Sequence, residues 1–314
     1  MADPTGRRAD VVKYVHIVDE VDGLDRGESL PLVVALQGFL DAGNGSSLAV
    51  DHLLADHAGP VVATFEVDVF HDYRARRPVV SFVSDHYEDY EPPRLVVRLM
   101  RDGLDHPYLL LTGPEPDTRW EAFTRDVRAV VEHFAVNLVV SMGSVPMAAP
   151  HSRPLALTQH ANRAGLMLRR NPWLGEMRVP ASAQALVEIR LGQKGHDATG
   201  YVAHVPHYLA QFDYPLAAQV LLEGVEDSSG LSFDLDEIKV AADAKAREIA
   251  DYLAEHPDVA EVVAGLEQQY DAFARSEQAG QSLLAEDEPI PTGDEIGEQF
   301  EQFLAGLDGP ENQN

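Results

Sequence analysis

The first 222 residues alternate between short apolar runs and longer segments with a helical pattern, and this alternation restricts the possible folds more than any other feature. Leu32–Gln37 is almost continuously apolar, which is typical of a strand buried on both faces. Comparable runs predict strands at 61–67, 95–100, 108–112, 138–142, 155–158 and 200–205. Helical patterns lie between them, at 47–57, 118–134 and 181–191, and another begins at 215. The sequence therefore predicts an α/β fold, a three-layer α/β/α core domain with a mostly parallel sheet over residues 10–225.

The C-terminal third has a different composition. Residues 223–314 hold 24 acidic and four basic residues, a net charge of −20, whereas residues 1–222 carry only −8 of the total of −28. Helical patterns at 235–255 and 259–278 are separated by His256-Pro257, so a helical hairpin appendage is predicted over 234–278. An acidic linker is expected at 286–294 and a short amphipathic C-terminal helix at 295–307.

Composition excludes several classes of site. The chain has no cysteine, so disulfides, thiolate nucleophiles, zinc–thiolate sites and iron–sulfur clusters are excluded. Histidine is frequent, but His204 and His207 do not form a metal-ligand motif, and neither a metal nor a cofactor is predicted. This acidic protein should repel nucleic acid, and no apolar run approaches the ~20 residues of a membrane span. With no apolar stretch of a signal peptide at the N-terminus, a cytoplasmic location is expected.

Four polar turns follow four of the predicted strands, at residues 38–44, 113–117, 143–153 and 204–208. The carboxyl ends of parallel strands meet at one edge of a sheet, which is where α/β proteins bind ligands. We therefore expect one ligand crevice there, bordered by Gly38, Asp41, Asn44, Glu115, Gly143, His151 and Arg153.

Each turn also has a purely structural interpretation. The turn at Asn44 either binds an anion at a helix N-terminus or is a tight turn with Asn44 or Ser46 as the N-cap of the helix. Glu115 either acts as a base or binds a hydroxyl, or it is a solvated acid at the start of a helix. Arg153 either clamps an anion or bonds loop carbonyls, with His151 packed beside it. His160, which follows a predicted strand, is interpreted as a core or cap residue. A hydrolase elbow is not formed, because Gly143-Ser144 is followed by Val-Pro.

A group of arginines, Arg74, Arg76 and Arg77, stands out in so acidic a chain. The group could recognise a phosphate or the carboxylates of a partner, but such arginines more often pair with local acids or with another subunit. The apolar face of the 295–307 helix would add to a subunit interface. A homo-oligomer is therefore expected.

Several spaced motifs resemble one known family. They are Gln37–Gly43, Asp72–Pro78, Gly113–Pro116 with Arg119-Trp120, and the stretch from Gly143 to Pro154. Over roughly residues 11–307 the chain is similar to the proteasome assembly chaperone 2 family, in particular to its actinobacterial branch, formerly labelled ATP-grasp-like. An ATP-grasp ligase needs paired lysines, yet only Lys13 and Lys194 precede the acidic C-terminal third.

The resemblance implies an α/β/α fold like that of nucleoside phosphorylases and peptidyl hydrolases, self-association, and a link to proteasome biogenesis. The bacterial branch has no settled activity. Because no complete catalytic motif is present, the expected function is that of a non-catalytic assembly or interaction protein with a proteasome-related protein partner. The alternative is an enzyme of phosphorylase or hydrolase type that acts on a small anionic molecule in the predicted crevice.

Overall fold

The computed structural model describes residues 13–19, 21, 24, 30–55, 58–169, 171 and 176–278. The chain divides into two compact units, residues 1–267 and 268–314, and every contact discussed below lies within the first. The predicted linker at 286–294 and the predicted helix at 295–307 lie outside the described residues.

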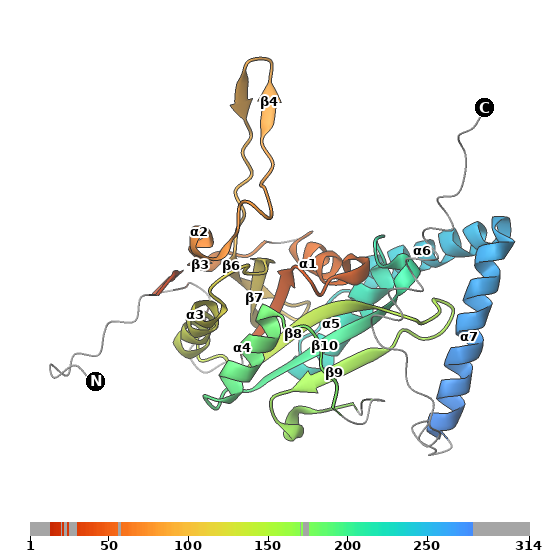
Figure 1. Cartoon of the computed structure of the whole chain (residues 1–314). Coiled ribbons are helices and arrows are strands. Elements are labelled where there is room, and N and C mark those ends of the chain that lie inside the picture. The colour runs from red at the N-terminus through yellow and green to blue at the C-terminus, as the bar shows by residue number, and fades with distance from the viewer. Residues whose placement is uncertain are drawn as a thin grey trace. The chain divides into compact units, whose positions relative to one another are not determined.

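An eight-stranded sheet forms the centre of the first unit (Figure 1). Its strand order is β1-β3-β6-β7-β2-β8-β10-β9. The strands are β1 (Val15–Ile17), β2 (Pro31–Gln37), β3 (Val61–Phe65), β6 (Val96–Arg101), β7 (Pro107–Pro114), β8 (Leu138–Met147), β9 (Leu157–Ala161) and β10 (Ala198–Pro206). The four central strands, β7, β2, β8 and β10, run parallel, so their carboxyl ends and the turns that follow share one edge.

The outer strands pair antiparallel, which the sequence patterns did not predict. β1, β3 and β6 join the sheet on one side and β9 on the other, all antiparallel to their neighbours. Only residues 102–106 connect β6 to β7, a link too short for the crossover that parallel strands need. The expected parallel arrangement therefore holds for the centre of a mixed sheet.

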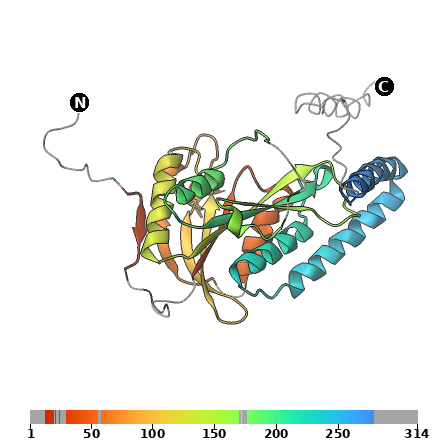
Figure 2. The ribbon, with the colours of Figure 1, turned by 90° about the horizontal axis from the view of Figure 1, so that it is seen from below.

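Helices cover both faces of this sheet, which confirms the three-layer α/β/α fold (Figure 2). Helices α1 (Gly45–Ala55) and α5 (Pro215–Ser229) pack on one face, and α3 (Trp120–His133) and α4 (Ala183–Gly192) on the other. The side chains of β2 alternate between these layers, because successive residues of a strand point to opposite faces. Val33 therefore contacts the α1–α5 layer, and Leu32 and Val34 contact the α3–α4 layer.

Two helices, α6 (Asp236–Glu255) and α7 (Pro257–Gln278), occupy the segment for which a helical hairpin is predicted, and their packing as a hairpin stays a prediction. α6 packs against α5 and buries Ile238 and Ile249 in the same core as α5. Of the described helices, none has both the length and the apolar character needed to cross a lipid bilayer.

A hairpin of β4 (Ser81–Val83) and β5 (His86–Glu88) extends away from the layered domain (Figure 1). It was not predicted, because three-residue strands are too short to show a clear alternation. It follows the one-turn helix α2 (Val67–Phe70), where the predicted strand at 61–67 has already ended.

Candidate functional site

The turns after the central strands contact one another at the carboxyl edge of the sheet. Leu40, in the turn after β2, accepts a hydrogen bond from the amide of Ser144 in β8 (3.1 Å). Gly43 N–H donates to the carbonyl of Ala210, beyond β10 (2.8 Å), and Gly43 O accepts from the amide of Tyr214 (2.9 Å). Three chain segments that are distant in sequence are thus joined by backbone hydrogen bonds.

Glu115 connects the turn after β7 to two further elements. Its Oε1 accepts a hydrogen bond from the amide of Ala183 at the first turn of α4 (2.7 Å). Its Oε2 accepts one from the amide of Phe39 in the turn after β2 (3.3 Å). A Cβ at position 38 would lie 2.5 Å from this Oε2, so Gly38 is needed for the close approach. Both carboxylate oxygens of Glu115 therefore hold backbone amides, which is a positioning role.

Asp41 caps helix α1. Its Oδ1 accepts from the amides of Ser46 (2.7 Å) and Ser47 (3.3 Å), and its Oδ2 accepts from Ser47 Oγ. An N-terminal carboxylate satisfies amides that have no partner within the helix and also suits the helix dipole. The predicted cap residue was Asn44 or Ser46, and that assignment is wrong. The side-chain amide of Asn44 instead donates to Asp213 Oδ1 (2.7 Å).

Gly143 lies beside the turn after β2, where a Cβ would come within 3.2 Å of Leu40 Cβ. The next residue, Ser144, is fully buried and donates its hydroxyl hydrogen to the carbonyl of Ala42 (2.7 Å). Gly143 and Ser144 therefore provide close packing at this edge of the sheet.

His151 and Arg153 have other neighbours. The amide of His151 donates to the hydroxyl of Tyr208 (2.9 Å), and its Nδ1 lies 2.8 Å from the same oxygen. Arg153 Nη1 lies 3.5 Å from Glu267 Oε1, a carboxylate that also accepts the hydroxyl hydrogen of Ser152. Burial lowers the pKa of His151 below its ordinary value of 6.5, against the opposing influence of Glu267.

The seven predicted crevice residues therefore form two groups. Gly38, Asp41, Asn44, Glu115 and Gly143 belong to the contacting turns, and their side chains or close approaches fix backbone segments to one another. His151 and Arg153 contact Tyr208 and Glu267 instead. A ligand-binding role for these turns stays a prediction.

Of the predicted arginine cluster, Arg76 is tied into the fold. Its guanidinium donates to the carbonyl of Glu115 and lies 2.7 Å from Asp117 Oδ1. Burial tends to raise the pKa of Asp117, but the Arg76 guanidinium and the amide of Asp72 lower it below its ordinary value. Arg74 and Arg77 are exposed.

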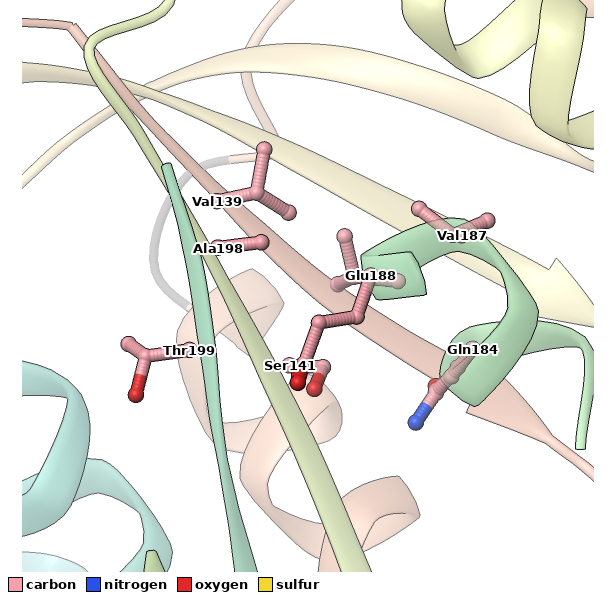
Figure 3. A pocket seen from close by; sticks show the side chains of 8 residues that line it. Val139, Ser141, Gln184, Val187, Glu188, Ala198 and Thr199 are labelled. Carbon is pink, nitrogen blue, oxygen red and sulfur yellow. The ribbon is translucent and has the colours of Figure 1, made fainter. Parts of the chain in front are cut away.

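A cavity of about 10 Å³ lies between α4 and the sheet (Figure 3), with room for about one water molecule. Val139, Val187 and Ala198 form apolar parts of its wall, and Ser141 and Glu188 contribute polar groups (Figure 3). Glu188 also contacts His160, with 2.6 Å between Oε2 and Nδ1. The sequence patterns gave no reason to connect Ser141, His160 and Glu188. His160 was interpreted as a core or cap residue.

No three metal-ligating side chains come together among the described residues, histidine and carboxylate groups included.

Comparison with known proteins identifies the family. The PAC2 family model matches residues 35–253, which include all of the predicted crevice residues. The chain belongs to the PAC2 family. No curated protein matches the sequence.

Solved structures of similar proteins include two from Mycobacterium tuberculosis. One is Rv2714, of unknown function, with 40% identity and a TM-score of 0.79, covering 83% of this chain and 92% of that chain. The other is Rv2125, described as a proteasome-assembly chaperone homologue, with 28% identity and a TM-score of 0.69, covering 74% of this chain and 100% of that chain. A Corynebacterium glutamicum protein of unknown function is 34% identical, with a TM-score of 0.77, and covers 82% of this chain and 97% of its own.

Replacing Glu115 tests its positioning role. We expect Glu115→Ala to lower the free energy of unfolding by about 1.5–3 kcal/mol, because the amides of Ala183 and Phe39 lose a charged acceptor. Urea unfolding followed by circular dichroism measures this change. The matched control is Glu132→Ala. Glu132 is half exposed and lies 3.5 Å from Arg128, and a surface ion pair of this kind contributes little to the free energy of unfolding. Equal stabilities of the two variants would contradict the role assigned to Glu115.

The depressed pKa of His151 predicts a pH dependence of stability. The unfolded chain takes up this proton at a higher pH than the folded chain, so the contribution is present above pH 6.5 and is lost as the pH falls below it. We expect the unfolding free energy to fall less in His151→Gln than in the parent chain between about pH 7.5 and 5.5. Urea titrations across this range measure the difference, and parallel curves would show that His151 makes no such contribution.

Proposed function

We propose that this PAC2 protein is an assembly or interaction protein that forms a homo-oligomer through the β4–β5 hairpin. The exposed apolar surface of the hairpin is the observation on which the proposal rests. Phe82 and Tyr87 form a cross-strand pair with ring centroids 5.0 Å apart, yet they are 62% and 73% exposed. Val79 and Tyr90 beside them are 65% and 54% exposed. A contiguous apolar surface of this kind is typical of a protein–protein contact.

The base of the hairpin is firmly attached to the domain, as an interaction arm requires. Arg76 contacts the carbonyl of Glu115 and the carboxylate of Asp117. Asp117 Oδ2 also accepts the amide hydrogen of Asp72 (2.7 Å), and His71 Nε2 lies 2.9 Å from the carbonyl of Arg76. Arg76 therefore supports the arm from inside, while Arg74 and Arg77 remain exposed beside it as candidate interface residues.

A second copy of the chain suits this surface. Within the described residues, β4 and β5 pair only with each other, and a two-stranded hairpin is only marginally stable in water. Each copy offers the same unpaired strand edges and the same apolar side chains. Pairing between copies would satisfy both, which is the usual route to a symmetric oligomer.

The PAC2 relative Rv2125, a proteasome-assembly chaperone homologue, supports a role in proteasome biogenesis. The net charge of −20 between residues 223 and 314 would favour a partner with a basic surface. A cytoplasmic location fits this role. The alternative, an enzyme acting on a small anion, stays a prediction, and its main anion-binding candidate, Arg153, is near the carboxylate of Glu267.

Light scattering coupled to size exclusion tests the oligomer. We expect light scattering to give the parent chain a molar mass well above the 34.4 kDa of one chain. The double variant Phe82→Ser/Tyr87→Ser should have the molar mass of a monomer. Phe212→Ser is the matched control, since Phe212 is 59% exposed outside the hairpin and should leave the assembly unchanged. A monomeric parent chain, or an assembly that survives the double variant, would refute this interface.

Affinity capture from the native cells tests the partner. We expect a tagged chain to retain proteasome subunits, with the signal falling as salt screens the acidic surface. Capture is quantified by mass spectrometry against the Phe82→Ser/Tyr87→Ser variant. If proteasome subunits are not enriched over an untagged control, the proteasome link fails while the oligomer proposal stands.

A further inference from the structure

Ser141, His160 and Glu188 come together on the face of the sheet that α4 covers. Ser141 on β8 is in register with Gly200 on β10, and Gly200 is in register with His160 on β9. Residues in register point to the same side of a sheet, so Ser141 and His160 flank Gly200. Glu188 reaches this place from α4, and it lines the same cavity as Ser141 (Figure 3).

Glycine at position 200 leaves the space between the two side chains open. A Cβ there would lie 2.2 Å from Ser141 Oγ and 2.7 Å from His160 Nε2, so any other residue would displace both. The hydroxyl of Ser141 and the Cε1–Nε2 edge of the His160 imidazole therefore both border the volume that a side chain of residue 200 would fill.

Glu188 determines how the imidazole is oriented. Its Oε2 lies 2.6 Å from His160 Nδ1, and an ionised carboxylate can only accept a hydrogen bond. The neutral imidazole therefore carries its proton on Nδ1, which leaves Nε2 without a hydrogen and able to accept a proton. A nucleophile, a base and a third group that orients the base are the three parts of an activated serine.

We propose that Ser141 is an acyl-accepting nucleophile, with His160 as its general base and Glu188 as the residue that positions His160. Ser141 Oγ forms a bond to the carbonyl carbon of an ester, and His160 Nε2 takes the hydroxyl proton. The bond from carbon to the leaving oxygen then breaks, and His160 returns the proton to that oxygen. Water releases the acyl group by the same proton transfers, which regenerates Ser141.

The surroundings restrict the acyl group. The cavity beside Ser141 has a volume of about 10 Å³, room for about one water molecule, so it favours the smallest acyl groups over longer ones. Glu188 is the one charged residue among those that line it, which disfavours an anionic substrate. Ser141 is only 8% exposed, whereas the side chain of His160 is 39% exposed, so the ester approaches from the side of β9. The inferred substrates are uncharged esters of short acids.

A second hydroxyl–imidazole pair in the chain provides a control. Thr158 Oγ1 lies 2.8 Å from His204 Nε2, and His204 is buried. Because neither residue belongs to the Ser141 group, replacing His204 tests for a general disturbance of the neighbouring strands.

The experiment treats the full chain with p-nitrophenyl acetate and locates the acetyl group by peptide mass spectrometry. We expect one acetylated serine, Ser141, and a burst of nitrophenol that Ser141→Ala abolishes. His160→Gln should slow this acetylation at least about 100-fold, because the general base is lost. Glu188→Gln should also slow it, since an amide no longer fixes the tautomer. His204→Gln should retain the rate of the parent chain.

Three outcomes would overturn the proposal. The first is the absence of acetyl from Ser141 in the parent chain, and the second is an acetylation rate that His160→Gln leaves unchanged. The third is an equal loss in His160→Gln and His204→Gln, which would assign the effect to the strands rather than to a base. Circular dichroism of each variant confirms that the compared chains are folded.

Discussion

The bond between the Glu115 carboxylate and the first turn of α4 is the interaction on which the arrangement of this edge depends. α4 begins after a long connection from β9, and its N-terminal amides need acceptors that the helix cannot supply. Ser182 caps the amide of Ala185, and Glu115 caps that of Ala183 from a different part of the chain. The same carboxylate reaches the turn after β2, which only glycine at position 38 permits. One side chain thus fixes the relation between two central strands and a covering helix.

Gln184 extends this attachment into the core. Its side-chain oxygen accepts the amide hydrogen of Leu36 (2.8 Å), and its amide donates to the carbonyl of Met142 (3.0 Å). The pairing of β2 with β8 ends at Val34 and Ser141, so both backbone groups lie just beyond the residues that the two strands pair. Buried backbone groups without partners are costly, so the buried glutamine replaces hydrogen bonds that the two strands do not make with each other here. The position of α4 is therefore set by polar contacts as well as by the apolar packing of Val187 and Leu191.

Periodicity predicted the elements of the layered domain because each is long enough to show its pattern. The continuous apolar run of β2 correctly predicts a strand that is buried on both faces, and the one-sided apolar pattern of α3 correctly predicts a helix that buries one side. The antiparallel direction of the outer strands was missed, since pairing direction depends on tertiary contacts and not on composition, and the short β4–β5 hairpin was missed as well. Asp41 was placed in the right turn, yet its capping role was assigned to Asn44 or Ser46, because several residues of that turn are common caps.

The Ser141 group shows a second limit. Ser141, His160 and Gly200 come from three strands, and only the strand order and register make them neighbours. A strand serine without an elbow motif carries no local signal of reactivity, and a strand glycine indicates only a close approach. The interpretation of His160 as a core or cap residue followed from its position after an apolar run. Its contact with Glu188 could not be predicted, because it depends on where α4 lies.

Glu115 also connects the two regions for which functions are proposed. Its carbonyl accepts from Arg76, which supports the base of the hairpin, while its carboxylate holds the start of α4. Glu188 lies within the same helix, less than two turns from Ala183. A helix of ten residues moves as a rigid body, so the attachment that places the interaction arm also sets the distance from Glu188 to His160 on β9. The arm and the serine site are therefore geometrically linked through one residue, although they lie at different places on the sheet.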